Sequence, residues 1–191
     1  ETLALGEVDS PYNDLRARDQ LAEEGSLPII GTEVAKASAA PVLVWGDSHA
    51  MSLLTAFDEL GKSHGATVYV AAHPSTPPLI QTWTPRIGHD AIHWGEEVIA
   101  QIESLEIKTV FMTGRWQLYL EPTADGDQRN LIADESGSDR PAEVFTNAFE
   151  RTLDRLSQMD VEVWVMDDVP LQDHSVPETL MLASIREIDL N

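Results

Sequence analysis

The stretch Pro41-Val42-Leu43-Val44-Trp45-Gly46-Asp47-Ser48-His49-Ala50 decides how this chain folds. Its apolar run, 42–45, has the length and the β-branched content of a buried parallel strand. The run stops at Gly46, and the apolar residues after it recur at the spacing of a one-sided helix: Ala50, Leu53, Leu54, Phe57 and Leu60. Ser48 therefore lies where a strand passes into a helix.

The same alternation continues along the chain. Apolar runs predict strands over 67–71, 108–113 and 161–166, and helical spacing predicts helices over 92–105 and 145–156. An alternating order of strands and helices implies parallel strands with right-handed crossovers. We therefore predict an α/β fold, a three-layer α/β/α sandwich built on a parallel sheet.

Two kinds of segment fall outside this alternation. Residues 1–40 are polar and acidic with scattered Pro and Gly, so we predict a lead-in or linker that packs on the domain's edge, with one short helix over 15–24. Residues 121–141 are rich in Asp, Gly, Ser and Pro and are expected to form a surface loop. The folded domain is expected to span 41–191, and its last part, 167–191, opens with a proline-bearing loop.

The charge of the chain excludes some partners. Twelve basic and thirty-three acidic residues give a formal charge of −21, which argues against nucleic acid or an anionic membrane surface. The sequence contains no cysteine and no apolar stretch of the roughly twenty residues that a membrane span needs. It begins with Glu1 rather than Met, so we expect a segment of a longer precursor.

Ser48 has two possible roles. In an open parallel sheet the carboxyl ends of the strands face the crevice where ligands bind, and a helix N-terminus there offers free N–H groups. A serine at this point can expose its hydroxyl to a substrate while its backbone N–H helps to hold an oxyanion. Alternatively, Asp47 and Ser48 only cap the helix, since both residue types are preferred N-caps.

The residues around Ser48 resemble a known family. Gly46-Asp47-Ser48-His49 is similar to the first block of the SGNH (GDSL-type) hydrolases, and Val42 to Ala50 resembles the SGNH domain fused behind the membrane part of the type-three acyltransferases. The resemblance implies that Ser48 is a nucleophile. It also implies a fifth parallel strand and a closing helix that this chain does not supply, so we expect the domain to be incomplete at its C-terminus.

Two further blocks fit this branch of the family. The loop 73–79, which contains Ser75, resembles the Pro-Pro loop that contributes an oxyanion donor; alternatively it is a rigid surface turn. Gly114-Arg115-Trp116-Gln117 stands where ordinary SGNH esterases have Gly-x-Asn-Asp. Arg115 could bring charge to an oxyanion, and Trp116 could form an apolar wall or a sugar-stacking face. Alternatively, Trp116 and Tyr119 are core residues at the edge of the sheet.

The base that a nucleophilic serine needs is the weak point of the resemblance. A serine attacks an acyl carbon only if a base, normally an oriented His, takes its proton. The family supplies this base as an Asp-x-x-His pair near the C-terminus. This chain has that spacing only at Asp90 and His93, which come too early and for which a structural role is favoured; His174 does not have the spacing. We expect the true pair on chain beyond residue 191.

The resemblance implies an extracytoplasmic domain, tethered to a membrane in the whole protein, that moves an acyl group, often acetyl, through Ser48 to a hydroxyl of a cell-surface glycan. The membrane part would deliver the acyl donor. A free-standing carbohydrate esterase and a non-catalytic glycan-binding or structural module remain as alternatives. No cofactor is expected, and no metal, because His64, His73 and His89 do not have a ligand spacing.

Overall fold

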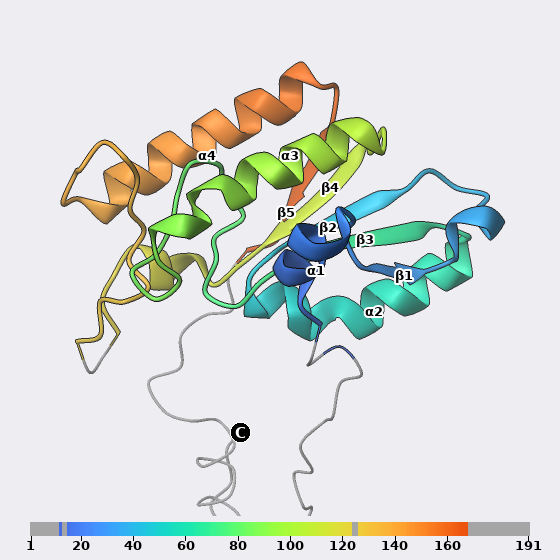
Figure 1. The fold of residues 1–191 in the computed structure, drawn as a ribbon, viewed down its shortest axis with the longest axis horizontal. Coiled ribbons are helices and arrows are strands. Elements are labelled where there is room, and N and C mark those ends of the chain that lie inside the picture. Colours follow the sequence, from blue (N-terminus) through green and yellow to red (C-terminus); the bar gives the residue numbers. More distant parts are fainter. Residues whose placement is uncertain (1–11, 13–14, 124–125, 168–191) are drawn as a thin grey trace, which may run out of the picture.

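A five-stranded sheet forms the centre of the molecule in the computed structural model, which describes residues 12, 15–123 and 126–167 (Figure 1). The strand order is β1-β3-β2-β4-β5. The last four strands along the chain pair parallel with one another, whereas β1 pairs antiparallel with β3. The strands are β1 (Ile29–Gly31), β2 (Val42–Gly46), β3 (Thr67–Ala72), β4 (Thr109–Thr113) and β5 (Glu162–Val165).

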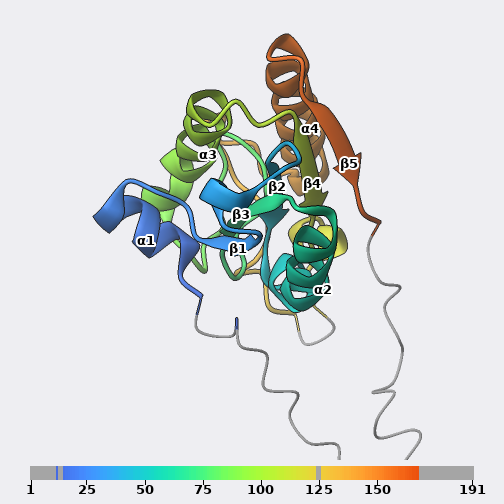
Figure 2. The same cartoon turned by 90° about the vertical axis from the view of Figure 1, so that its right-hand side faces the viewer.

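Helices cover both faces of this sheet, so the predicted three-layer α/β/α architecture is confirmed (Figures 1 and 2). Buried side chains of α1, α3 and α4 pack on one face, and α2 packs on the other. The helices are α1 (Ala17–Glu24), α2 (Ser48–His64), α3 (Trp94–Ser104) and α4 (Pro141–Gln158). Short 3-10 helices complete the described elements: η1 (Val34–Lys36), η2 (His89–His93) and η3 (Trp116–Tyr119).

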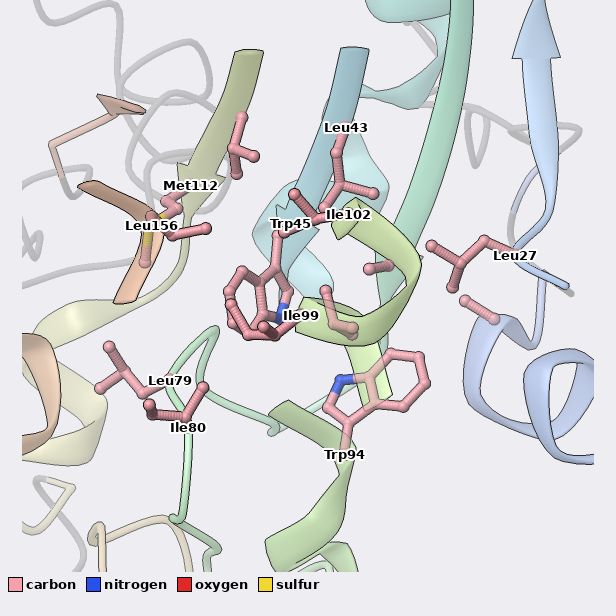
Figure 3. Packing of buried hydrophobic residues seen from close by; sticks show 14 of the residues in the cluster. Leu27, Leu43, Trp45, Leu79, Ile80, Trp94, Ile99, Ile102, Met112 and Leu156 are labelled. Atoms are coloured by element: carbon pink, nitrogen blue, oxygen red, sulfur yellow. The ribbon is translucent and has the colours of Figure 1, made fainter. Parts of the chain in front are cut away.

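The larger core lies between the sheet and the layer of α1, α3 and α4 (Figure 3). Trp45 points from β2 into this core and is fully buried. It lies among the apolar side chains of α3 and its neighbours: Leu43, Leu79, Ile99, Ile102, Met112 and Leu156. Burial of this apolar surface fixes β2, and with it the residues that follow β2, in the middle of the sheet.

Helix α2 begins and ends where its sequence supplies caps. Asp47 is the N-cap, and its side chain accepts a hydrogen bond from the His49 backbone N–H. Gly65 is the C-cap, with a φ of 66° that favours glycine. Gly61 lies inside the helix instead, where an added Cβ would come within 2.9 Å of the Gly31 Cα atom. Its lack of a side chain lets α2 pack closely on β1.

The sequence analysis did not predict β1. Its three residues between Pro28 and Thr32 are too few to show the alternation of a strand, and the strand forms because Tyr69 and Val68 of β3 lie opposite it. As a result the sheet is mixed, with an antiparallel strand on one edge of the parallel set.

Part of the segment predicted as a lead-in belongs to the described fold. Ala17 of α1 is fully buried in the larger core, and Leu27 is 1% exposed there. The division of the chain at residue 40 stays a prediction. The loop and helix considered for 168–191 lie outside the described residues.

Candidate functional site

Ser48 is exposed and is the first residue of α2, directly after the end of β2. In the register of the sheet, Gly46 lies opposite Ala72 of β3 and Thr113 of β4. The carboxyl ends of three parallel strands therefore meet beside Ser48, which is the edge where α/β sheets bind their ligands. The predicted position of this serine in the fold is confirmed.

The carboxylate of Asp47 connects two parts of this edge: the first turn of α2 and the segment 114–116 after β4, which we call the Arg115 corner. Asp47 is 1% exposed, and its Oδ1 atom accepts from the His49 backbone N–H at 2.7 Å. Its Oδ2 atom accepts from the Arg115 backbone N–H at 2.9 Å and from the Tyr119 hydroxyl at 2.6 Å. Asp47 therefore caps α2, as the alternative interpretation proposed, and also fixes the Arg115 corner beside the first turn of that helix.

Two glycines, Gly46 and Gly114, allow the end of β2 and the Arg115 corner to approach each other closely. A Cβ added to Gly46 would lie 1.9 Å from the Thr113 carbonyl oxygen and 2.8 Å from the Ala50 Cβ. A Cβ added to Gly114 would lie 3.3 Å from Asp47 Oδ2. Gly46 is required here for space, and Gly114 leaves room for the buried carboxylate.

Arg115 and Trp116 follow β4 at the same edge but face different surroundings. The Arg115 side chain is half-buried, and within the described part of the chain no group pairs with its guanidinium. The Trp116 indole N–H donates to the Met166 carbonyl at 2.8 Å, and its ring meets Phe145 and Phe149 of α4 edge to face. These contacts match the alternative in which Trp116 packs at the edge of the sheet.

Ser75 lies in a tight turn after β3, the strand beside β2. The Thr76 backbone N–H donates to the His73 carbonyl at 3.2 Å, and Ser75 has a φ of 57°, in the left-handed region that few side chains occupy. The His73 backbone N–H donates to the Gly46 carbonyl at 3.1 Å. This turn is therefore attached directly to the end of β2, two residues before Ser48.

The imidazole of His73 is held by the same turn. Its Nδ1 atom lies 2.8 Å from Thr76 Oγ1 and 3.0 Å from the Pro74 carbonyl oxygen. Burial lowers the pKa of His73 below its ordinary value, and the positive charge of Arg18 lowers it further. The ring is therefore neutral at pH 7.

The structure describes one of the two histidines considered as a base, His93, and does not describe the other, His174. His93 is exposed at the end of η2, where the chain enters α3, and the Asp90 side chain is outside the described parts of the structure. His174, which lacks the Asp-x-x-His spacing, lies outside the described residues. The choice of base stays a prediction.

Sequence reasoning did not foresee the link between Tyr119 and Asp47. Tyr119 was considered as a core residue, and it is fully buried, but its hydroxyl ends on the carboxylate that caps α2. The two residues are 72 positions apart, so no local spacing could have paired them.

Three further features concern ligands and membranes. A groove of about 620 Å³ lies between α3 and α4, and Ser48 does not line it. Within residues 12, 15–123 and 126–167, no group of three or more potential metal ligands is close enough to hold an ion. None of the described helices has both the length and the apolar character to cross a membrane.

Comparison with known proteins adds a family and a structural likeness. The family described as "SGNH domain (fused to AT3 domains)" matches residues 14–190. A solved structure described as the periplasmic domain of a lipopolysaccharide acetyltransferase from Salmonella ser. Paratyphi A is similar at 12% identity, with a TM-score of 0.46 over 71% of this chain. This chain spans half the length of that one. Comparison with curated proteins found no match.

Proposed function

Because the chain belongs to the family of SGNH domains that are fused to AT3 domains, we propose that it transfers an acyl group through Ser48 to a hydroxyl of a cell-surface glycan. The membrane part of the whole protein would deliver the acyl group, acetyl in the simplest case. The domain would work outside the cytoplasmic membrane, where such glycans are found.

One observation carries this proposal. Ser48 is exposed at the carboxyl end of β2, and the buried Asp47 beside it holds the Arg115 corner in place. Asp47 supplies the N-cap of α2, so Ser48 is not needed for capping. The Ser48 hydroxyl, the N-terminus of α2 and the backbone of Arg115 lie at one edge of the sheet, which supports the proposal.

The chemistry follows from these groups. Ser48 Oγ attacks the acyl carbon while a base removes its proton, and the negative charge passes to the carbonyl oxygen. The Ser48 backbone N–H, the guanidinium of Arg115 and a backbone N–H of the Ser75 turn are the proposed donors to that oxygen. The leaving group of the acyl donor then departs, which leaves the acyl group on Ser48. A glycan hydroxyl then attacks this acyl group and takes it from Ser48.

The proposal is tested by trapping the acyl-enzyme. We expect a fluorophosphonate probe to modify Ser48. We also expect p-nitrophenyl acetate to increase the mass of the protein by one acetyl group, and mass spectrometry of tryptic peptides should locate that group on Ser48. Both experiments use this chain and a longer one that reaches an Asp-x-x-His pair, and we expect modification of Ser48 only in the longer one, because the base is expected there. Ser48→Ala should lose both signals. Ser52→Ala, an exposed serine one turn further along α2, is the matched control and should keep them.

The outcomes separate the alternatives. Labelling of Ser48 with transfer of acetyl to an added oligosaccharide supports the transferase. Labelling with release of acetate to water alone supports the free-standing carbohydrate esterase. Absence of labelling in both the short and the long chain would leave a non-catalytic module that has kept the fold.

A further inference from the structure

An aromatic pair lies on the loop between β3 and α3, and the proposed chemistry at Ser48 does not use it. The rings of Trp83 and His89 meet edge to face, with centroids 4.5 Å apart and an angle of 65° between their planes. Trp83 is half-buried, whereas His89 is exposed. The pair therefore presents aromatic surface to solvent on a loop rather than in the core.

The Trp83 backbone is held in place by the long loop after β4. Trp83 and Ala133 form a β-bridge, in which the Trp83 N–H donates to the Ala133 carbonyl at 3.0 Å and the Ala133 N–H donates back at 2.9 Å. Figure 1 shows these two loops side by side, the green one before α3 and the gold one before α4. Trp83 is thus carried on a backbone that is bonded to the neighbouring loop.

Side chains add to this connection. The Arg86 backbone N–H donates to the Arg129 carbonyl at 2.8 Å, and Arg86 Nε donates to Asn130 Oδ1 at 3.0 Å. Asn130 is 6% exposed, so this last bond is shielded from water. A preformed surface of this kind loses little conformational entropy when it binds a ligand.

Both loops lead back to the edge that carries Ser48. Thr84, next to Trp83, donates through its hydroxyl to the Ser75 carbonyl at 3.1 Å, in the turn attached to Gly46. On the other side, the Ile132 N–H donates to the carbonyl of Tyr119, whose hydroxyl binds Asp47. The loops that carry the aromatic pair are therefore bonded to the Ser75 turn and to Tyr119, on two sides of the candidate site.

The net charge of the chain favours an uncharged ligand over an anionic one. Arg86 and Arg129 both form ion pairs with Asp127, at 3.2 and 2.7 Å. The hydrogen bonds of Arg129 hold the pKa of Asp127 well below its usual range, so the carboxylate keeps its charge and its partners at neutral pH. The two guanidinium groups share this one carboxylate, so the three groups together carry one positive charge, but the chain as a whole carries −21 and repels an anionic sugar.

We propose that Trp83 and His89 form a subsite for an uncharged pyranose ring of the acceptor glycan. An aromatic ring offers a flat apolar face to the C–H face of a sugar, and the polar side chains around it can bond the hydroxyls. The inference rests on the proposed function for its role, because the subsite would hold the glycan beside Ser48. Sugar binding itself needs neither Ser48 nor an acyl donor.

The test is a titration of the ¹⁵N-labelled 191-residue chain, followed through its five tryptophan indole N–H signals. Trp83→Phe assigns the Trp83 signal. The probes are maltohexaose, cellohexaose and mannohexaose, with hexagalacturonate as the anionic comparison. We expect at least one neutral probe to shift the Trp83 signal. Trp83→Ala and His89→Ala should each weaken the binding of that probe about tenfold, measured on the remaining signals and by calorimetry.

Trp164→Ala is the matched control, because Trp164 is 54% exposed on β5, away from both loops. It should leave the binding constant unchanged. The inference is overturned if no neutral probe moves the Trp83 signal, if hexagalacturonate binds more tightly, or if Trp164→Ala weakens binding as much as Trp83→Ala. Ser48→Ala should bind the probes as the parent does, so a failure of acyl transfer leaves this result readable.

Discussion

At the scale of single residues, the hydrogen bond from the Tyr119 hydroxyl to Asp47 can be tested directly by its contribution to stability. We expect Tyr119→Phe to lower the free energy of unfolding by about 2 kcal/mol, because it removes a hydrogen bond to a buried carboxylate and leaves the shape of the ring unchanged. Urea denaturation followed by circular dichroism measures it. A loss below about 0.5 kcal/mol, the size of a neutral surface change, would show that Asp47 does not depend on this bond.

Gly46 gives a second prediction at this scale. Gly46→Ala should destabilise the fold by about 3 kcal/mol or more, because the new Cβ would meet the backbone of β4, which cannot move without breaking the sheet. Gly137→Ala is the control. It meets no atom within 4 Å and only strains a φ of 69°, so it should lose about 1 kcal/mol. Thermal unfolding of both variants would decide the matter, and equal losses would contradict the packing argument.

The sequence was most informative where chemistry and position coincide in a few neighbouring residues. Ser48 and Asp47 follow an apolar run directly, so their place at the end of a strand could be predicted. The role of Trp116 could not, because its partners Phe145, Phe149 and Met166 come from elements far along the chain. Contacts between distant segments are set by the three-dimensional packing and leave no local spacing to read.

At the scale of elements, Asp58 of α2 connects the helix to the segments before it. Asp58 accepts from the Gly31 N–H at 2.7 Å and from Lys62 Nζ, and the Tyr12 hydroxyl bonds the same carboxylate. Burial and this bond raise the pKa of Tyr12 to about 12. Since the ordinary value is about 10, the fold favours protonated Tyr12.

A pH prediction follows from this shift. The stability that Tyr12 contributes is fully present below pH 10 and is lost as the pH rises from 10 through about 12. The free energy of unfolding of Tyr12→Phe should therefore differ from that of the parent by a constant amount between pH 7 and 9. This difference should become smaller as the pH rises from 10 to about 12. Urea denaturation of the two proteins at matched pH values is the measurement. A difference that stays constant up to pH 12 would contradict the bond to Asp58.

Long periodic elements were predicted well and short ones were not. Helix α4 has apolar residues at helical spacing, and β3 is a continuous apolar run, so both were expected near their observed bounds. Strand β1 and the 3-10 helices span three to five residues each. The hydrogen bonds of β1 come from β3, and a 3-10 helix of a single turn is too short to show a periodic pattern.

At the scale of the whole molecule, the charge of −21 should make stability depend on salt. Carboxylates repel one another across the folded surface, and raising the salt from 10 to 300 mM shortens the screening length from about 30 Å to about 6 Å. We expect the free energy of unfolding to rise by about 1 kcal/mol over this range. Denaturation by urea in sodium chloride measures it, with choline chloride as the control for ion-specific effects. A fall in stability with either salt would contradict this prediction.

The carboxylate of Asp47 has one more consequence, which concerns motion. Because one buried side chain is bonded at once to the start of α2, to the backbone of Arg115 and to η3, these three parts cannot separate one at a time. The edge around Ser48 therefore behaves as a rigid frame rather than a hinge. Any opening that admits a ligand must therefore come from the surrounding loops, while the surroundings of Ser48 stay constant.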